Sequence, residues 1–267
     1  MKKILILFAI CSMAVTSAFS QQDDTYYTDD ESTVVVKAEI APPALPTYVQ
    51  PPCPGEGYLW TPGYWAWGTG GYYWVPGVWV MPPSVGLLWT PGYWGFYHGY
   101  YGWHRGYWGP HIGYYGGVAY GYGYGYWGTG FYGGRWEGGH FLYNTAVWRV
   151  GGGFHNVYAD RSVVRNVSVH ASFNGPGGVR YRPSGGEIGV MHENHVEPAR
   201  EHVAHEQNMG GERGQFHATT NGHPAVHSMS TPGGARFNAG GHAIHAGGGG
   251  AAPHGGGGGG GHGGGRH

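Results

Sequence analysis

The stretch Trp60-Thr61-Pro62-Gly63-Tyr64-Trp65 decides the fold, because the chain uses the same six-residue pattern several times. Clear copies are Trp74-Val75-Pro76-Gly77-Val78-Trp79 and Trp89-Thr90-Pro91-Gly92-Tyr93-Trp94, so the three starts lie 14 and 15 residues apart. A looser copy is Trp103-His104-Arg105-Gly106-Tyr107-Trp108, and a degenerate one is Trp136-Glu137-Gly138-Gly139-His140-Phe141. Repetition at a short interval indicates one small structural unit that is used several times.

Each copy has the residues of a tight turn between two strands. Proline presets φ at one turn position and glycine accepts a positive φ at the next, so Pro62-Gly63 suits a type II turn. In such a two-residue hairpin Trp60 faces Trp65. Aromatic pairs across strands each contribute roughly 0.2–1 kcal/mol. The pattern therefore predicts an all-β fold, a small aromatic-rich β-meander of short hairpin repeats.

The region 109–134 is also aromatic, and Tyr and Gly alternate from Tyr120 to Tyr126. Alternation with a period of two places the tyrosines on one face of a strand and the glycines on the other. A loose glycine-rich loop is the other interpretation of the same residues, and the sequence leaves both open.

The composition excludes several classes of protein. Gly (57) and Pro (18) fill more than a quarter of the 267 residues, which is typical of low-complexity chain. Aromatic residues make up 16%, however, whereas disordered chain is ordinarily poor in them. Some of the chain must therefore pack, with rings in place of aliphatic side chains. A large enzyme domain, a collagen, a disulfide scaffold and a multi-span membrane protein are all disfavoured.

The N-terminus has the features of a secretory signal peptide over residues 1–20. Two lysines follow Met1, an apolar run extends from Ile4 to Val15, and small residues occupy Ala18 and Ser20. The run is too short for a membrane span, so we expect no transmembrane span in the mature form. The predicted location is the periplasm or the cell envelope. The single mature cysteine, Cys53, is either free or paired with another chain.

The mature chain divides into four zones by composition. Residues 21–57 are predicted to be an acidic and proline-rich linker, and residues 58–142 form the aromatic repeat region. Residues 143–182 are predicted to be a short β-rich segment. Residues 183–267 are rich in Gly and His, and we expect a long disordered tail with one short helix around Glu193–Gln207.

The repeated Trp-x-x-Gly-x-Trp units resemble the bacterial YXWGXW (WXXGXW) repeat family of exported proteins. The segments Phe154–Val164 and Ser172–Val179 are similar to the segments that follow the repeats in that family. The resemblance implies an exported protein, and it brings no catalytic residues to this chain.

The tryptophans of the repeats have two interpretations. In the first, the rings are simply the core of a thin β structure. In the second, one row of rings stays exposed and binds an envelope polysaccharide, peptidoglycan or an envelope protein, or self-associates. A nucleic acid partner is excluded, because the repeat zone has only Arg105 and Arg135 as basic residues. The candidate binding residues are Trp60, Trp65, Trp74, Trp79, Trp89, Trp94, Trp103 and Trp108.

Histidine provides the second candidate site. Of 18 histidines, twelve lie at or beyond His192. The pairs His192/His195 and His202/His205 are each three residues apart, so on a helix each pair shares one face. Neutral imidazoles suit Ni, Cu or Zn. Scattered histidines in a glycine-rich segment are also a common compositional bias, which needs no metal.

These observations favour a non-enzymatic, exported cell-envelope protein with a structural or binding role. The chain has no Gly-x-Ser-x-Gly motif and no phosphate-binding loop followed by lysine, so catalysis has little support. The alternative is an exported metal-binding or metal-buffering protein that uses its histidine-rich tail.

Overall fold

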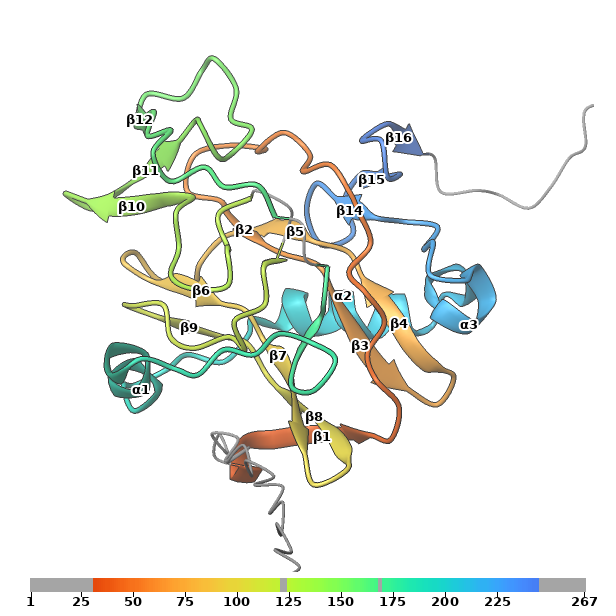
Figure 1. The fold of residues 1–267 in the computed structure, drawn as a ribbon. Helices are drawn as coiled ribbons and strands as arrows, with labels where there is room; N and C mark the ends of the chain where they lie inside the picture. The colour runs from red at the N-terminus through yellow and green to blue at the C-terminus, as the bar shows by residue number, and fades with distance from the viewer. Residues whose placement is uncertain (1–30, 121–123, 168–169, 245–267) are drawn as a thin grey trace, which may run out of the picture.

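The computed structural model describes residues 31–120, 124–167 and 170–244 (Figure 1). The predicted signal peptide and the final glycine-rich run lie outside the described residues.

The repeat region forms two groups of four strands. The first group, unit 1, contains β2 (Leu59–Thr61), β3 (Tyr64–Gly68), β4 (Gly71–Val75) and β5 (Val78–Val80). The second group, unit 2, contains β6 (Leu88–Thr90), β7 (Tyr93–Tyr97), β8 (Tyr100–His104) and β9 (Tyr107–Gly109).

The other elements surround these two units. Before them lie η1 (Glu31–Thr33) and β1 (Val34–Ala38), and after them β10 (Gly134–Glu137), β11 (His140–Asn144), β12 (Val157–Tyr158) and β13 (Phe173–Asn174). The C-terminal part contains α1 (Gly185–Met191), α2 (Arg200–Gly210), η3 (Arg213–Gln215), α3 (His217–Thr220), β14 (Ser228–Met229), β15 (Arg236–Phe237) and β16 (Ala243–Ile244). Strands predominate, which confirms the predicted all-β class.

Each unit is one antiparallel ribbon built from two copies of the repeat. In unit 1, β3 pairs with β4, and β2 pairs with β5 beyond the two Pro-Gly corners. Trp60 therefore faces Trp79, and Trp65 faces Trp74. Unit 2 repeats this arrangement, with β7 on β8 and β6 on β9. The predicted hairpin inside each copy is wrong for these four copies, because each copy pairs with its neighbour instead.

The degenerate fifth copy does form the short hairpin. Trp136 faces Phe141 across β10 and β11, and the two central glycines, Gly138 and Gly139, have φ of 56° and 81°. Two positive φ values give the turn the twist that a two-residue hairpin prefers. An L-proline followed by glycine cannot provide this twist, which explains why the three Pro-Gly copies bend at the corner rather than fold back.

The corner glycines are needed for close approach and not for a positive φ. None of the four has a left-handed φ. A Cβ placed on Gly63 would lie 2.4 Å from Cζ2 of Trp74 and 2.8 Å from the backbone nitrogen of Gly77. The corresponding Cβ-to-Cζ2 distances are 2.5 Å for Gly77 on Trp60, 2.6 Å for Gly92 on Trp103 and 2.5 Å for Gly106 on Trp89. The first tryptophan of each copy thus covers the glycine of its partner copy.

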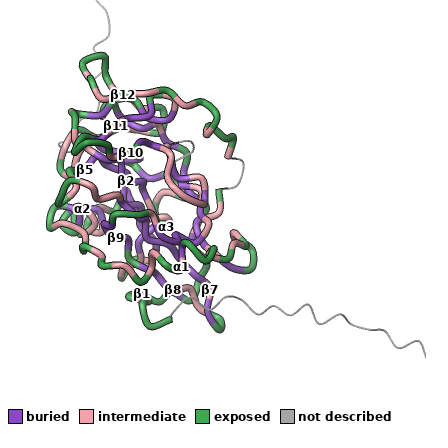
Figure 2. Tube along the Cα trace, turned by 90° about the vertical axis from the view of Figure 1, so that its left-hand side faces the viewer, coloured by how far each residue is buried: buried purple, intermediate pink, exposed green. Residues whose placement is uncertain are grey.

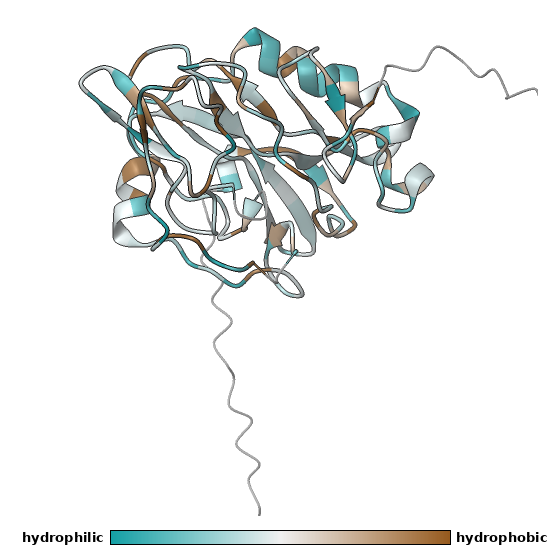
Figure 3. Cartoon of the chain, turned by 90° about the horizontal axis from the view of Figure 1, so that it is seen from above, coloured by the Kyte–Doolittle hydropathy of each residue, from teal (hydrophilic) through white to brown (hydrophobic). Residues whose placement is uncertain are grey.

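The aromatic rings of the repeats form the core. Figure 2 shows buried residues along the central strands. The four Trp–Trp pairs across the ribbons have ring centroids 5.2–5.4 Å apart. The same strands are pale in Figure 3, because the rings and glycines lie near the middle of the hydropathy scale. A hydropathy profile therefore does not reveal this core.

The proline-rich segment before the repeats is part of the body rather than a linker. Leu45, Tyr48 and Gln50 are buried in it. Its carbonyl groups accept hydrogen bonds from buried indoles, as Ala44 does from Trp65 and Pro51 from Trp79, both at 2.9 Å. Proline lacks an N–H, so each proline of this extended segment brings a carbonyl acceptor into the core without a backbone donor that needs a partner. The predicted linker at 21–57 is therefore wrong for residues 41–54.

The aromatic loop and the segment after it contain little regular structure. Among the described residues of 110–133 no strand forms, so the loop interpretation is the correct one there. Buried tyrosines fasten this loop, since the hydroxyl groups of Tyr120 and Tyr126 donate to the carbonyls of Gly92 and Trp89 at 2.7 Å. Beyond β11, the predicted β-rich segment at 143–182 holds only the two-residue strands β12 and β13 in its described part.

The described residues of the predicted disordered tail are ordered. A capping box starts α1, in which the Ser184 hydroxyl accepts from the Glu187 N–H and the Glu187 carboxylate accepts from the Ser184 N–H. The helix α2 packs against β4 and β3. The disorder prediction is thus wrong for 183–244, because the aromatic body supplies the apolar surface that this composition lacks. Helix α2 also begins later than the predicted Glu193–Gln207.

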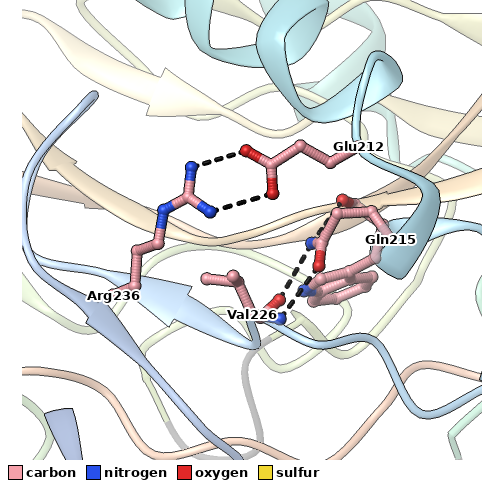
Figure 4. Close-up of polar contacts among 5 residues, drawn as sticks. Glu212, Gln215, Val226 and Arg236 are labelled. Carbon is pink, nitrogen blue, oxygen red and sulfur yellow. Dashed lines mark hydrogen bonds and ion pairs between the residues drawn. The ribbon is translucent and has the colours of Figure 1, made fainter. Parts of the chain in front are cut away.

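Two polar contacts fasten the C-terminal part to itself and to unit 1 (Figure 4). Arg236 donates to both carboxylate oxygens of Glu212, at 2.9 and 2.5 Å. The buried Gln215 donates to the carbonyls of Trp74 and Val226 and accepts from the Val226 N–H. A fully satisfied buried amide of this kind fixes the position of both segments.

We expect the alanine variant Gly63→Ala to be strongly destabilised. Its Cβ would clash with the Trp74 ring and with the Gly77 backbone, and overpacking of a core costs about 1–3 kcal/mol. Urea unfolding of the two proteins measures the difference. The matched control is Gly152→Ala, whose Cβ meets no atom within 4 Å and whose stability we expect to be unchanged or slightly higher. Equal loss in both variants contradicts the proposed role of the corner glycine.

Candidate ligand groove at the repeat corners

The eight predicted binding tryptophans are core residues. Their exposed fractions run from 0% for Trp60, Trp74, Trp79 and Trp108 to 6% for Trp103. Their ring faces contact other rings, so the hypothesis of an exposed row of tryptophans is wrong. The first interpretation, a β structure with rings as its core, is the one the structure shows.

The four predicted metal-binding histidines do not come together. His192 is exposed, and His195 stacks on Tyr107 with ring centroids 3.6 Å apart. His202 and His205 are buried under α2, where His202 contacts Trp89 and His205 bonds the Pro76 carbonyl at 2.9 Å. Within 31–120, 124–167 and 170–244, no group of three or more His, Cys, Asp or Glu side chains is placed to hold a metal ion. A metal site made by these two pairs is therefore not supported.

A groove of about 120 Å³ lies where α2 crosses the corners of both units, and we call it the corner groove. Its floor and walls come from the corners around Pro62, Pro91 and Gly106, with Tyr120 from the aromatic loop. Its polar lining residues are Tyr64, Arg105, His202, Glu206 and Gln207.

Tyr64 lines the corner groove and contacts both an aromatic and an acidic residue of it. Its ring stacks on Trp103 with centroids 4.9 Å apart and an angle of 15°. Its hydroxyl donates to a Glu206 carboxylate oxygen at 2.8 Å. Burial raises the pKa of Tyr64 well above its usual value, and the neighbouring Glu206 carboxylate raises that pKa further. Tyr64 therefore remains a protonated donor and orients Glu206 toward the groove.

Arg105 provides the positive charge at the rim of the corner groove. It occupies the position in the fourth copy where the first three copies have proline. Its side chain is exposed and forms no ion pair with any described residue. A second hollow of about 280 Å³ shares Pro91, Arg105 and Gly106 with the corner groove. Arg105 thus separates two adjoining hollows.

The corner groove has the composition of a small-molecule binding site. Small-molecule sites are typically apolar and aromatic with a few placed polar groups, and this groove follows that description. An engineered cavity of about 150 Å³ holds one benzene ring, so the corner groove has room for about one six-membered ring.

The fold and the groove define an aromatic-core β protein with paired repeats. The family model that matches is the WXXGXW repeat, in two copies over residues 55–80, which is unit 1. The chain therefore contains WXXGXW repeats over these residues, and unit 2 shows the same pairing geometry outside them. No curated protein and no solved structure matches the chain at a significant level. In the described part of the chain, no helix is both long and apolar enough to span a bilayer.

Sequence reasoning overlooked the polar residues of the corner groove. Tyr64 and Arg105 both lie within copies of the repeat. The replacement of proline by Arg105 in the fourth copy could have marked this position as one with a role other than packing. Glu206 lies 142 residues beyond Tyr64, so only the placement of α2 reveals their contact.

The buried histidines predict a loss of stability in mild acid. Burial lowers the pKa of His202 to about 3, and burial also lowers the pKa of His205. Below pH ~6.5 the unfolded chain binds a proton that folded His202 does not, so stability falls as the pH falls from there to about 3. The expected loss is about 1.4 kcal/mol per pH unit for one such residue.

The variant His202→Phe keeps a ring on Trp89 and removes the titrating group. We expect its free energy of unfolding to fall less than that of the unaltered chain between pH 7 and pH 5, measured by urea titration. His192→Gln is the control, because His192 is exposed, and it should keep the original pH dependence. An unchanged pH dependence in His202→Phe would show that another group is responsible.

Proposed function

We propose that this chain is a non-enzymatic, exported cell-envelope protein that binds an envelope polysaccharide or peptidoglycan at the corner groove. The observation that carries the proposal is the meeting of Arg105, Glu206 and Gln207 beside the Tyr64–Trp103 stack. A sugar ring has an apolar face for the aromatic wall and hydroxyl groups for the polar residues. A groove of this volume takes one ring at a time, which suits a residue of a polymer chain.

Export rests on the N-terminal sequence alone. The apolar run from Ile4 to Val15, with Ala18 and Ser20 before Gln21, supports cleavage after residue 20. We predict that the protein recovered from the periplasm or envelope of an expressing Gram-negative cell begins at Gln21, as read by N-terminal sequencing. Recovery of the uncleaved chain from the cytoplasm would overturn this part of the proposal.

The metal-binding alternative has no supporting observation among the described residues. His202 and His205 are buried in the packing of α2, and His195 is stacked on Tyr107. The histidines beyond residue 244 lie outside the described residues, and metal binding there stays a prediction.

Binding is tested by co-sedimentation of the mature chain with isolated peptidoglycan and envelope polysaccharide, with tryptophan fluorescence as a second readout. We expect the chain to pellet with at least one of them. We expect Glu206→Gln and Arg105→Gln each to weaken binding about tenfold, because a hydrogen bond to a charged group contributes about 1.5–3 kcal/mol. Fluorescence should also change, because Trp89 and Trp103 line the groove.

The matched control is Glu201→Gln, an exposed carboxylate on the same helix that does not line the groove. This variant should bind like the unaltered chain. Absence of pelleting by the folded chain, or equal binding by all variants, would overturn the proposal that the corner groove holds the ligand.

A further inference from the structure

A third hollow, separate from the corner groove and from the hollow beside it, is lined by two arginines. It has a volume of about 440 Å³ and shares no residue with the corner groove. Arg165 and Asn166 line it from one segment, Val179 and Arg180 from another, and Trp127 from the aromatic loop, with small residues between them. We call it the arginine pocket. Two arginines from separate segments thus line the same hollow.

The two arginines lack acidic partners. No Asp or Glu lines the arginine pocket, and neither Arg165 nor Arg180 forms an ion pair or hydrogen bond with a described residue. The chain does pair an arginine where the fold uses one, as Arg236 with Glu212 shows. The positive charge of Arg165 and Arg180 is therefore not neutralised by any described residue, and an anionic ligand can neutralise it.

The sequence around the arginine pocket separates positive from negative charge. Residues 161–186 contain four arginines and no acidic residue, whereas six glutamates follow between Glu187 and Glu212. None of these glutamates lines the arginine pocket.

A buried donor lies in the wall of the same pocket. The indole Nε1 of Trp127 is buried without a hydrogen-bond partner. A buried polar group without a partner costs about 1–3 kcal/mol. Trp60 and Trp108 also have such an indole N–H, but of the three only Trp127 lines the arginine pocket. A small adjustment of the Trp127 ring in a loaded pocket would give this N–H an acceptor.

We propose that the arginine pocket binds a phosphate monoester carried by a sugar ring. Guanidinium groups bind phosphate through paired N–H donors, and two of them match the charge of about −1.5 to −2 on a phosphate monoester at pH 7. A carboxylate ligand, with its single negative charge, would neutralise only half of the positive charge of the two guanidinium groups. The volume exceeds what a phosphate group needs, so the sugar occupies the remaining space beside Trp127 and Val179.

The test is calorimetric titration of the full chain with glucose 1-phosphate, with glucose and inorganic phosphate as comparison ligands. We expect saturable binding of glucose 1-phosphate that weakens as salt is raised, and no binding of glucose. Inorganic phosphate should bind more weakly. If it binds as tightly as glucose 1-phosphate, the sugar assignment is overturned.

Variants locate the site. We expect Arg165→Gln and Arg180→Gln each to weaken binding about tenfold or more, and Trp127→Phe to weaken it less. Arg161→Gln is the matched control, because Arg161 is exposed in the same segment but does not line the pocket, and it should bind normally. Thermal unfolding should be unchanged in all the arginine variants, since these side chains are exposed.

Two results overturn the proposal. One is equal binding of glucose 1-phosphate by all the arginine variants. The other is sedimentation of the chain with phosphatidylglycerol vesicles without binding of glucose 1-phosphate, which would make the surface a lipid contact. Neither result bears on the corner groove, because the two sites have no residue in common.

Discussion

The contact between a tryptophan and the glycine of a paired copy is the constraint on which the rest of the structure depends. Each indole crosses the neighbouring chain at the only residue type that leaves room for it, at a distance where any Cβ would clash. The contact is reciprocal, because Trp74 covers Gly63 while Trp60 covers Gly77. A single copy therefore cannot complete its own packing, and the copies are used in pairs. This explains why the chain builds two ribbons from four copies, and why the fifth copy, without a partner, closes on itself as a short hairpin.

Indole N–H groups buried in a core need acceptors, and the flanking segments supply them for three tryptophans of unit 1, whereas those of Trp60 and Trp108 have no partner in the described structure. Ala44 and Pro51 of the proline-rich segment accept from Trp65 and Trp79, and His227 of the C-terminal part accepts from Trp74. Unit 1 itself accepts from unit 2, through the Trp65 carbonyl and Trp94. Segments that look like linker and tail by composition are therefore as much part of the core as the repeats. An aliphatic core of the same size would not need them, because it has no donors to satisfy.

The sequence was sufficient to predict an aromatic β-repeat protein but not the pairing of the copies. Both a hairpin within Trp60–Trp65 and a ribbon joining it to Trp74–Trp79 place tryptophan opposite tryptophan, so the ring pattern does not distinguish them. The deciding fact is the space around Gly63, which depends on atoms of the partner copy. The ordered C-terminal part was missed for a related reason. Its glycines and histidines cannot form a core alone, and His202 packs only because Trp89 is already in place. The candidate site shares this dependence, since Glu206 meets Tyr64 only when α2 lies on the corners.

In a repeat whose tryptophans and glycines are committed to packing, ligand contacts must come from positions that differ between the copies. Arg105 stands where three other copies have proline, and it is the residue that gives the corner groove its positive charge. Tyr64 has the same position in its copy as Val78 and Tyr107 in theirs, yet only Tyr64 combines a stack on Trp103 with a hydrogen bond to Glu206. The arginines at 165 and 180 lie outside the repeats altogether, on segments that have little regular structure of their own. The repeats thus act as a rigid frame, and chemical specificity is placed on the exceptions to the pattern and on the irregular chain that the frame holds in position.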